Sequence, residues 1–504
     1  MSRGKKLMLN TTSSIVLQLI TVIVGFILPK LYLTYYGSEV NGLVSSITQY
    51  LGFISLAEFG VGAVTQSALY KPLAERNDDE ISRIIISSER FFRKLGCVLL
   101  VYCLLLIFVY PYMIDDSFSW WFTTGLILAI VISTFAQYYF CMSYRLLLLA
   151  DQLGYIQIGF QILTLIINTI LNIMFVINGF SIQIVKLSTS IIFLLQPLGI
   201  HFYVKRHYKI NKNIKLIEEP IKQKWNGLAQ HIAAVVVTKT DVAVLTFFSL
   251  ASVSVYNVYY IVVYGIQAII ESISNGIQSL LGNIYAKKEM DLLNKTFSLW
   301  EWSSHAIITF LYSCTGILIV PFVRVYTNGI TDANYIVPVF ATLLTVAYAF
   351  FCLRYPYTTM IKVAGHYKQT QMSCIIEAGI NVIFSIILVC FWWISGVAVA
   401  TLLAMIYRTM YCVFYLNKHI LFRPIKYYFK NLAVDIIVVL ICITATSWIK
   451  LGSITWISWI IMASKVSSIC FIIMIVVNSI FYFNNMKSVG NILKKKLYIN
   501  NKKL

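Results

Sequence analysis

The chain is a succession of long apolar stretches separated by short polar connections. An α-helix needs about 20 apolar residues to cross the hydrocarbon core of a bilayer, and about fourteen stretches reach that length. We expect membrane helices near residues 11–34, 40–64, 95–114, 120–142, 156–178, 181–203, 226–250, 255–284, 300–321, 335–353, 373–394, 396–416, 432–449 and 456–483. The pattern predicts an all-α integral membrane protein with no soluble domain between its spans. An even number of crossings puts both termini on one side.

Composition supports this assignment. Of the 504 residues, 59% are hydrophobic and 12% are charged, whereas soluble domains are usually about 25% charged. The net charge of +20 would indicate a nucleic-acid partner only if the basic residues lay on a soluble domain, so none is expected. The 10 cysteines lie in or beside apolar spans without metal-ligand spacing, which indicates packing residues and no metal or other cofactor.

The basic residues gather in one set of loops. Of the 40 Lys and Arg residues, 34 lie in the ends and loops of one side, including Arg354 and the segment from Arg408 to Lys430. The opposite side holds only Lys30, Arg324 and Lys450. The positive-inside rule makes the basic side, with both termini, cytoplasmic.

The sequence contains a weak internal repeat. The segment YRLLLLADQLGYIQIGFQILTLIINTILNIMFV (144–176) has a counterpart in YPYTTMIKVAGHYKQTQMSCIIEAGINVIFSIILV (355–389). Transporters are often built from such repeats. We therefore predict an N-terminal six-helix lobe (1–203), a basic cytoplasmic linker (204–225), a C-terminal six-helix lobe (226–420), and two extra helices with a basic tail (421–504). The two pseudo-symmetric lobes are expected to enclose a central cavity.

The span at 226–250 carries two charges, Lys239 and Asp241, near its middle. A charge at that depth costs on the order of 2.5–3.5 kcal/mol on insertion scales. Two residues correspond to a rotation of about 200° along a helix, so these side chains are not expected to neutralise each other directly. Either they lock helices together, or at least one faces a polar transport pathway.

Three stretches resemble polysaccharide-repeat (Wzx-type) flippases, whose superfamily also contains multidrug and toxin extrusion antiporters and lipid II flippases. The first, YYGSEVNGLVSSITQYLGFISLAEFGVGAVTQSALY (35–70), has an acidic residue before Phe-Gly, here Glu58. The second, TKTDVAVLTFFSLASVSVYNVYYIVVYGI (238–266), carries Asp241 and the pair Val255-Tyr256. The third is RYPYTTMIKVAGHYKQTQMSCIIEAGINVIFSIILV (354–389). The resemblance covers roughly residues 10–420.

The resemblance implies a function and partners. The implied substrate is an undecaprenyl-pyrophosphate-linked oligosaccharide, exported across the bacterial plasma membrane by alternating access for capsule, O-antigen or other cell-surface polysaccharide. The sugar-pyrophosphate head would pass through a cationic cavity between the lobes. Besides membrane lipids, glycosyltransferases and a polysaccharide polymerase would be its partners.

A pathway for that head group needs cations for phosphate and amides or aromatic rings for sugar. The candidate cations are Lys239, Lys30 and Lys186, although the last two could also snorkel to the interface. Lys465, in the last helix, is more simply explained by lipid or a partner. Glu58, Asp241 and Glu271 are candidates for proton or sodium coupling or for bracing lysines, and Asn381 for sugar contact. Glu377 and Asp435 are expected near the membrane interface.

Two alternatives remain open. A drug or cation antiporter of the same superfamily would favour acidic cavity residues, so Lys239 argues mildly against it. A membrane glycosyltransferase or polymerase is suggested by Asp115-Asp116 at an outer loop, but such enzymes usually add a large outer domain, and this chain has no room for one. We therefore expect a transporter rather than an enzyme.

Overall fold

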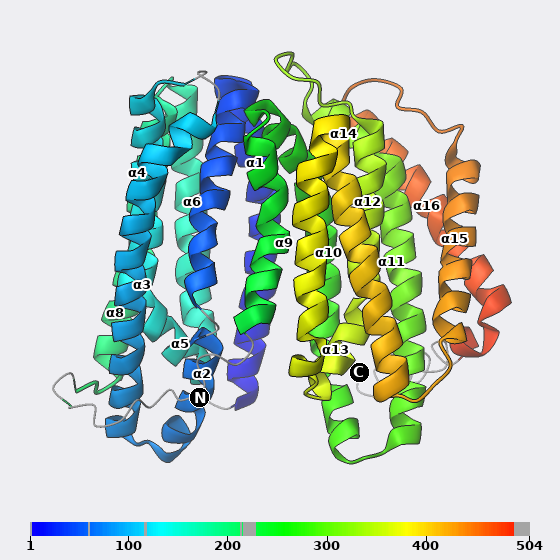
Figure 1. The fold of residues 1–504 in the computed structure, drawn as a ribbon, viewed down its shortest axis with the longest axis horizontal. Coiled ribbons are helices and arrows are strands. Elements are labelled where there is room, and N and C mark those ends of the chain that lie inside the picture. Colours follow the sequence, from blue (N-terminus) through cyan, green and yellow to red (C-terminus); the bar gives the residue numbers. More distant parts are fainter. Residues whose placement is uncertain (1–2, 59–60, 115–117, 212–213, 215–227, 488–504) are drawn as a thin grey trace, which may run out of the picture. The chain divides into compact units, whose positions relative to one another are not determined.

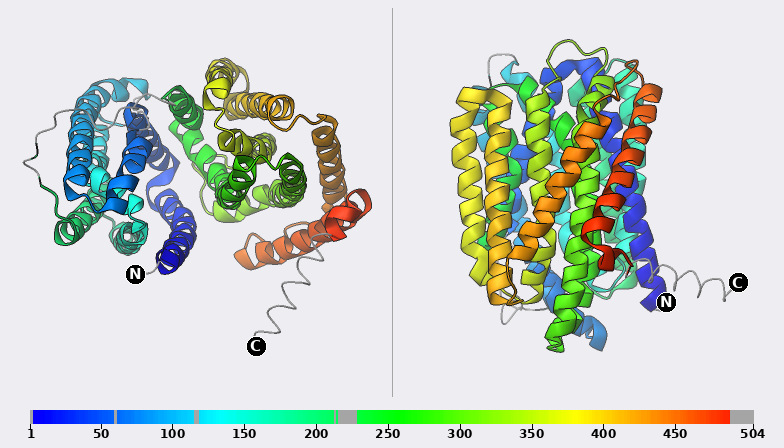
Figure 2. Two further views of the ribbon diagram at one scale, coloured as in Figure 1. Left: turned by 90° about the horizontal axis from the view of Figure 1, so that it is seen from below. Right: turned by 90° about the vertical axis from the view of Figure 1, so that its right-hand side faces the viewer.

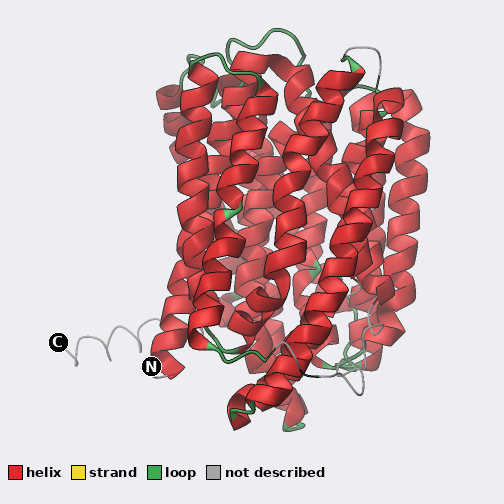
Figure 3. Cartoon of the chain, turned by 90° about the vertical axis from the view of Figure 1, so that its left-hand side faces the viewer, coloured by secondary structure: helices red, strands yellow, loops and turns green. Residues whose placement is uncertain are grey.

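The computed structural model describes residues 3–58, 61–114, 118–211, 214 and 228–487. Within these ranges the chain is built from helices and connections, with no strand (Figure 3). Eleven described helices are long and apolar enough to cross a membrane. The structure divides into two compact units, which are described separately: unit 1 comprises residues 1–257 and 329–333, and unit 2 comprises residues 258–328 and 334–504.

Unit 1 contains the first nine α-helices and the beginning of the tenth (Figure 1). They are α1 (Arg3–Gly52), α2 (Val61–Glu75), α3 (Asp78–Met113), α4 (Trp120–Ala136), α5 (Met142–Ala150), α6 (Gly154–Ile177), α7 (Ile182–Phe193), α8 (Leu195–His207), α9 (Leu228–Thr246) and α10 (Leu250–Ala286). A 3-10 helix, η1 (Phe53–Glu58), follows α1, and a π-helical turn, η2 (Gln137–Cys141), joins α4 to α5. Helix α1 packs on α6 and α9, and α4 packs on α7.

Helix α1 is broken at Gly37, where φ is 82°. Glycine adopts this left-handed conformation without the steric penalty of a Cβ atom. The backbone N–H and the hydroxyl of Ser38, the next residue, donate to the Asp332 carboxylate at 2.6 and 2.7 Å. The break therefore separates α1 into the first two predicted crossings, and the 329–333 segment is anchored where they meet.

Unit 2 contains the rest of α10 and the last six helices. They are α11 (Met290–Tyr326), α12 (Pro338–Leu353), α13 (Tyr355–Val363), α14 (Tyr367–His419), α15 (Lys426–Thr446) and α16 (Trp456–Phe481). Helix α12 packs against α11 and α14, and the last two helices, α15 and α16, pack against α11 and each other (Figure 2). Helix α14 is interrupted at Trp392 and Trp393, close to the predicted boundary between residues 394 and 396.

The described elements account for the fourteen predicted crossings. Helices α1 and α14 each supply two because of their breaks, and α4 with α5, α7 with α8, and α12 with α13 each supply one. Helices α3, α6, α9, α10, α11, α15 and α16 supply the other seven. The fold is therefore the all-α, multi-pass membrane architecture that the apolar pattern predicts.

The compact units are bounded differently from the predicted lobes. The division falls between Asn257 and Val258, inside α10, so that α9 lies in unit 1. A count of six helices per half instead puts the same helix in the predicted C-terminal lobe. The lobe boundaries at 203 and 226 stay a prediction, and most of the 204–225 linker lies outside the described residues.

Helices α1 and α10 approach very closely at Gly42. A Cβ atom added to Gly42 would lie 1.8 Å from the carbonyl oxygen of Leu250, the first residue of α10. Beside this contact, the Asn41 amide donates to the Ser254 hydroxyl at 2.7 Å. Small residues allow helices in a membrane to pack backbone to backbone in this way.

We predict that Gly42→Ala lowers the melting temperature of the purified protein by roughly 5 °C or more, because overpacking a tight contact costs about 1–3 kcal/mol or more. Scanning fluorimetry in detergent measures the change. The control is Gly265→Ala in α10, where an added Cβ meets no atom within 4 Å. Equal melting temperatures for the two variants would show that the α1–α10 approach is not tight.

Candidate functional site

A polar network containing Lys186 crosses three helices of unit 1. The Lys186 ammonium, on α7, donates to the Tyr32 hydroxyl on α1 at 3.1 Å and lies 4.2 Å from the centre of the same ring. The Tyr32 hydroxyl donates to the Asn172 side-chain oxygen on α6 at 2.5 Å. The cation is therefore held by a hydroxyl and an aromatic face.

Asn172 extends the network to other neutral groups. Its side-chain nitrogen donates to the Asn168 side-chain oxygen at 2.7 Å and to the Thr189 hydroxyl at 3.1 Å. Both asparagines are buried. Within the described part of the chain, no carboxylate forms an ion pair with Lys186. The network thus solvates a cation without neutralising it.

Lys239 and Asp241 take different partners, both in unit 1. Lys239 is half-buried and reaches the end of α1, where its Nζ is 3.0 Å from the position of a Cβ atom added to Gly52. Asp241 is 3% exposed and accepts a hydrogen bond from the Tyr256 hydroxyl at 2.9 Å. No ion pair joins Lys239 to Asp241 or to another described carboxylate. Glycine at position 52 leaves the room that the lysine side chain occupies.

The other predicted site residues are distributed over both units. Lys30 lies half-buried on α1, and Glu58 is the last residue of η1, with its side chain outside the described part. In unit 2, Glu271 is exposed and accepts from the Tyr355 hydroxyl at 3.2 Å. Asn381 is buried in α14 and donates to the Thr401 hydroxyl at 3.3 Å. Of the predicted set, Lys30, Lys186, Lys239, Glu58 and Asp241 therefore belong to unit 1.

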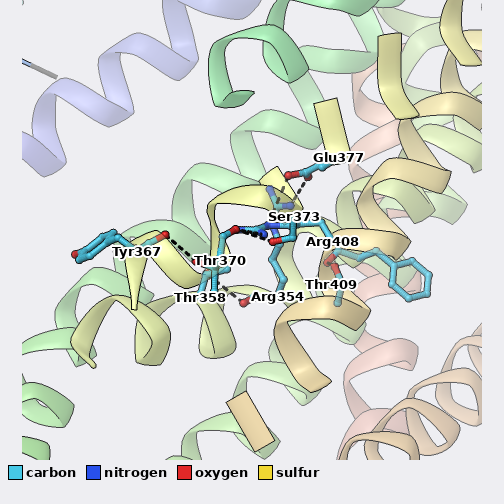
Figure 4. Close-up of polar contacts among 9 residues, drawn as sticks. Arg354, Thr358, Tyr367, Thr370, Ser373, Glu377, Arg408 and Thr409 are labelled. Atoms are coloured by element: carbon cyan, nitrogen blue, oxygen red, sulfur yellow. Dashed lines mark hydrogen bonds and ion pairs between the residues drawn. The ribbon is translucent and has the colours of Figure 1, made fainter. Parts of the chain in front are cut away.

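Unit 2 contains a buried charge cluster that the sequence analysis did not anticipate (Figure 4). Glu377, on the first half of α14, is bonded to the guanidinium of Arg354, which joins α12 to α13. Its second carboxylate oxygen lies 3.7 Å from Nε of Arg408, on the second half of α14. Arg408 also donates to the Thr370 carbonyl at 3.1 Å. One carboxylate thus holds two arginines.

The cluster adds burial to three sequence assignments whose membrane depth stays a prediction. Arg354 and Arg408 are predicted on the cytoplasmic side and Glu377 near the interface, and inside the protein their side chains are only 12%, 9% and 7% exposed. Each lies near the end of an apolar run, where sequence alone does not separate a loop from a buried helix end. The two arginines lie against Glu377, and their opposite charges offset the cost of burying these side chains.

A second buried cluster ties α11 to the last helices. The Arg423 guanidinium donates to the Glu301 carboxylate at 2.6 Å, and the Tyr357 hydroxyl donates to the same oxygen at 2.5 Å. One turn further along α11, His305 Nδ1 lies 2.5 Å from the Asp435 carboxylate on α15. Asp435, which is predicted near the interface, has a side chain that is only 13% exposed. These pairs fix the position of α15.

The two units therefore handle charge differently. The buried acids of unit 2 at positions 301, 377 and 435 each have a basic partner. In unit 1, Lys186 and Lys239 have no carboxylate partner among the described residues. Cations held by neutral groups inside helices are available to an anion. No group of described residues could hold a metal ion, and Asp115-Asp116 lie outside the described part.

The fold is that of a multi-pass helical membrane protein, and its first unit holds lysines that are partly buried among helices. No family model matches the chain, and no curated protein matches its sequence. Several solved structures, however, align with this chain. Lipid II flippase MurJ, in an inward closed conformation, aligns with a TM-score of 0.69 at 18% identity, covering 95% of this chain and 100% of the flippase.

Multidrug transporters also align. An inward-facing multidrug resistance MATE family transporter of the MOP superfamily gives a TM-score of 0.65 at 14% identity, covering 77% of this chain and 92% of that one. The eukaryotic MATE transporter AtDTX14 gives 0.52 at 12% identity, covering 93% and 98%. The chain thus shares its fold with these transporters, in agreement with the resemblance of its sequence motifs to flippases whose superfamily also contains multidrug antiporters and lipid II flippases.

We predict that Glu377→Gln destabilises unit 2 strongly, because it leaves two buried arginines without a carboxylate. Removing one partner of a buried ion pair costs about 3–5 kcal/mol, which lowers the melting temperature by roughly 5–10 °C. The control is Glu75→Gln, since Glu75 forms an exposed pair with Lys71 at 3.9 Å and such pairs contribute little. If the two variants have the same melting temperature, the cluster does not stabilise unit 2.

Proposed function

We propose that the chain is a flippase that moves an undecaprenyl-pyrophosphate-linked oligosaccharide from the inner to the outer leaflet of a bacterial plasma membrane. The observation that carries the proposal is the pair of intramembrane lysines, Lys186 and Lys239, without carboxylate partners in the described part of unit 1. A diphosphate is the part of this substrate that needs such cations. The fold likeness to lipid II flippase MurJ supports a lipid-linked substrate.

The surroundings of Lys186 suit the sugar as well as the phosphate. Tyr32 offers an aromatic face, and Asn168 and Asn172 are amides of the kind that hydrogen-bond to hydroxyl groups. In the proposal, the phosphate replaces part of the network around Lys186, and the substrate crosses by alternating access of the repeated halves.

Orientation and coupling belong to the same proposal. In the proposal both termini lie in the cytoplasm, where the lipid-linked sugar is assembled, and the 34 basic residues on one side support this orientation. Of the two acids proposed for proton or sodium coupling whose side chains are described, Asp241 is buried beside Tyr256. Glu271 is exposed in unit 2 and is a weaker candidate.

A drug or cation antiporter is the second candidate, supported by the fold likeness to MATE transporters. It requires an acidic site for a cationic substrate. The buried acids of unit 2 at positions 301, 377 and 435 already have basic partners, so its candidates are the three acids proposed for coupling, Glu58, Asp241 and Glu271.

We predict that Lys239→Gln and Lys186→Gln each slow the transport of a lipid-linked oligosaccharide in proteoliposomes by about tenfold or more, because each removes a charge-assisted hydrogen bond to phosphate. Lys239→Arg and Lys186→Arg should keep most of the activity. The control is Lys465→Gln, an exposed lysine on α16, which should transport like the wild type. All variants are compared at equal reconstituted amounts and after checking their melting temperatures.

Two results would overturn the proposal. If the glutamine variants at positions 186 and 239 transport as fast as Lys465→Gln, both lysines are structural. If the wild type exports cationic drugs but does not translocate the lipid-linked sugar, the chain is an antiporter.

A further inference from the structure

A basic pocket of about 660 Å³ lies in unit 1 at the C-terminal end of α8. It is formed between α5, α8 and the segment that follows α8, and α8 packs on α5, α6 and η2. Figure 1 shows α8 beside α5 in the lower part of this unit. The polar side chains that line the pocket are those of Tyr144, His201, Lys205, Tyr208, Lys209 and Asn211.

The two lysines of the pocket are not neutralised within the described part of the chain. Lys205 and Lys209 are exposed, and neither forms an ion pair with a described carboxylate. The nearby carboxylate of Asp151 is already engaged: it accepts from Lys6 at 3.1 Å and from the Tyr208 hydroxyl at 2.5 Å. Glu89, which is hydrogen-bonded to Tyr144 of the pocket wall, is likewise paired with Arg93 at 3.2 Å. Among the described residues, the pocket therefore carries surplus positive charge.

Tyr208 adds a neutral polar group to the pocket wall. Burial, together with the hydrogen bond to Asp151, raises the pKa of the Tyr208 hydroxyl well above its usual value. Because the group stays protonated at every physiological pH, it adds no negative charge that would oppose an anion.

An exposed apolar strip leads along α8 to this pocket. Leu198 and Phe202 are 53% and 68% exposed, and they lie on one face of the helix with Lys205, at spacings of four and seven residues. Leu195, 44% exposed, continues the strip. Lys209 follows two residues after the helix ends at His207. The surface thus passes from apolar to cationic within about three turns, at the end of a candidate membrane span.

We infer that this pocket binds the phosphate group of an anionic membrane lipid, with Lys205 and Lys209 on the phosphate and the acyl chains along Leu198 and Phe202. Basic pockets at the cytoplasmic ends of membrane helices are suited to such headgroups. The inference does not depend on the transported substrate, because the pocket is separate from the network around Lys186. A soluble phosphate would use the same lysines but would gain nothing from the apolar strip.

The test measures thermal stabilisation of the full-length protein in detergent at low ionic strength. Phosphatidylglycerol, phosphatidylcholine and inorganic phosphate are titrated separately. Only phosphatidylglycerol should raise the melting temperature of the wild type. In Lys205→Gln/Lys209→Gln, the half-maximal shift should need about thirtyfold more of this lipid. That factor corresponds to the loss of two lysines, each of which contributes about 1 kcal/mol of attraction to an anionic membrane surface.

Two control variants make the result specific. Lys362→Gln/Lys368→Gln removes the same charge from exposed lysines of unit 2 and should respond like the wild type, as should Lys205→Arg/Lys209→Arg. If Lys362→Gln/Lys368→Gln weakens the response to phosphatidylglycerol as much as Lys205→Gln/Lys209→Gln does, the effect is general electrostatics and the site is overturned. If inorganic phosphate raises the melting temperature as much as phosphatidylglycerol does, the assignment to a lipid is overturned. If Lys205→Gln/Lys209→Gln responds to phosphatidylglycerol like the wild type, the pocket is overturned.

Discussion

A charge inside a membrane-spanning helix needs a compensating group, and the placement of those groups determines what each unit of this protein can do. The bilayer core supplies no water to solvate an ammonium or a carboxylate. Unit 2 compensates its charges internally, as in the Arg354–Glu377–Arg408 cluster. Unit 1 instead surrounds Lys186 with a tyrosine and amides. The first solution fixes helices, and the second leaves a cation able to bind.

This contrast explains why the proposed site lies in unit 1. An anionic head group gains little from a cation that a carboxylate already neutralises, because it would have to displace that carboxylate. Hydroxyl and amide groups are exchanged more easily, since they are neutral and offer donors and acceptors to sugar as well. The clusters at Glu301 and Glu377 are then scaffolding, which holds α11 and α14 in position.

The fold could largely be predicted from sequence, because a span needs only a minimum length of apolar residues. Even the two breaks left signals: Gly37 supplies a left-handed conformation, and the interruption at Trp392 and Trp393 lies within a few residues of the predicted helix boundary. The network around Lys186 could be predicted less well. Lys186 was identified as a candidate, but its contact with Tyr32 joins residues 154 positions apart.

The buried cluster of unit 2 was missed for a physical reason. Counting basic residues by side predicts the orientation, and Arg354 and Arg408 carry the sign expected at cytoplasmic ends. Whether such a residue lies in water or against a carboxylate depends on packing between helices. An acid such as Glu377 near the end of an apolar run is the one local signal, since an unpaired carboxylate there is costly.

The sequence spacing within this cluster also bears on how the protein enters the membrane. Arg354 and Glu377 are 23 residues apart, on either side of the short helix α13. A chain that is inserted while it is synthesised delivers both charges within one helical hairpin, so they can enter the bilayer as a neutral pair. Arg408 arrives later, when that pair can already receive it. On this order of synthesis, the charges that hold the finished unit together need not cross into the bilayer unpaired.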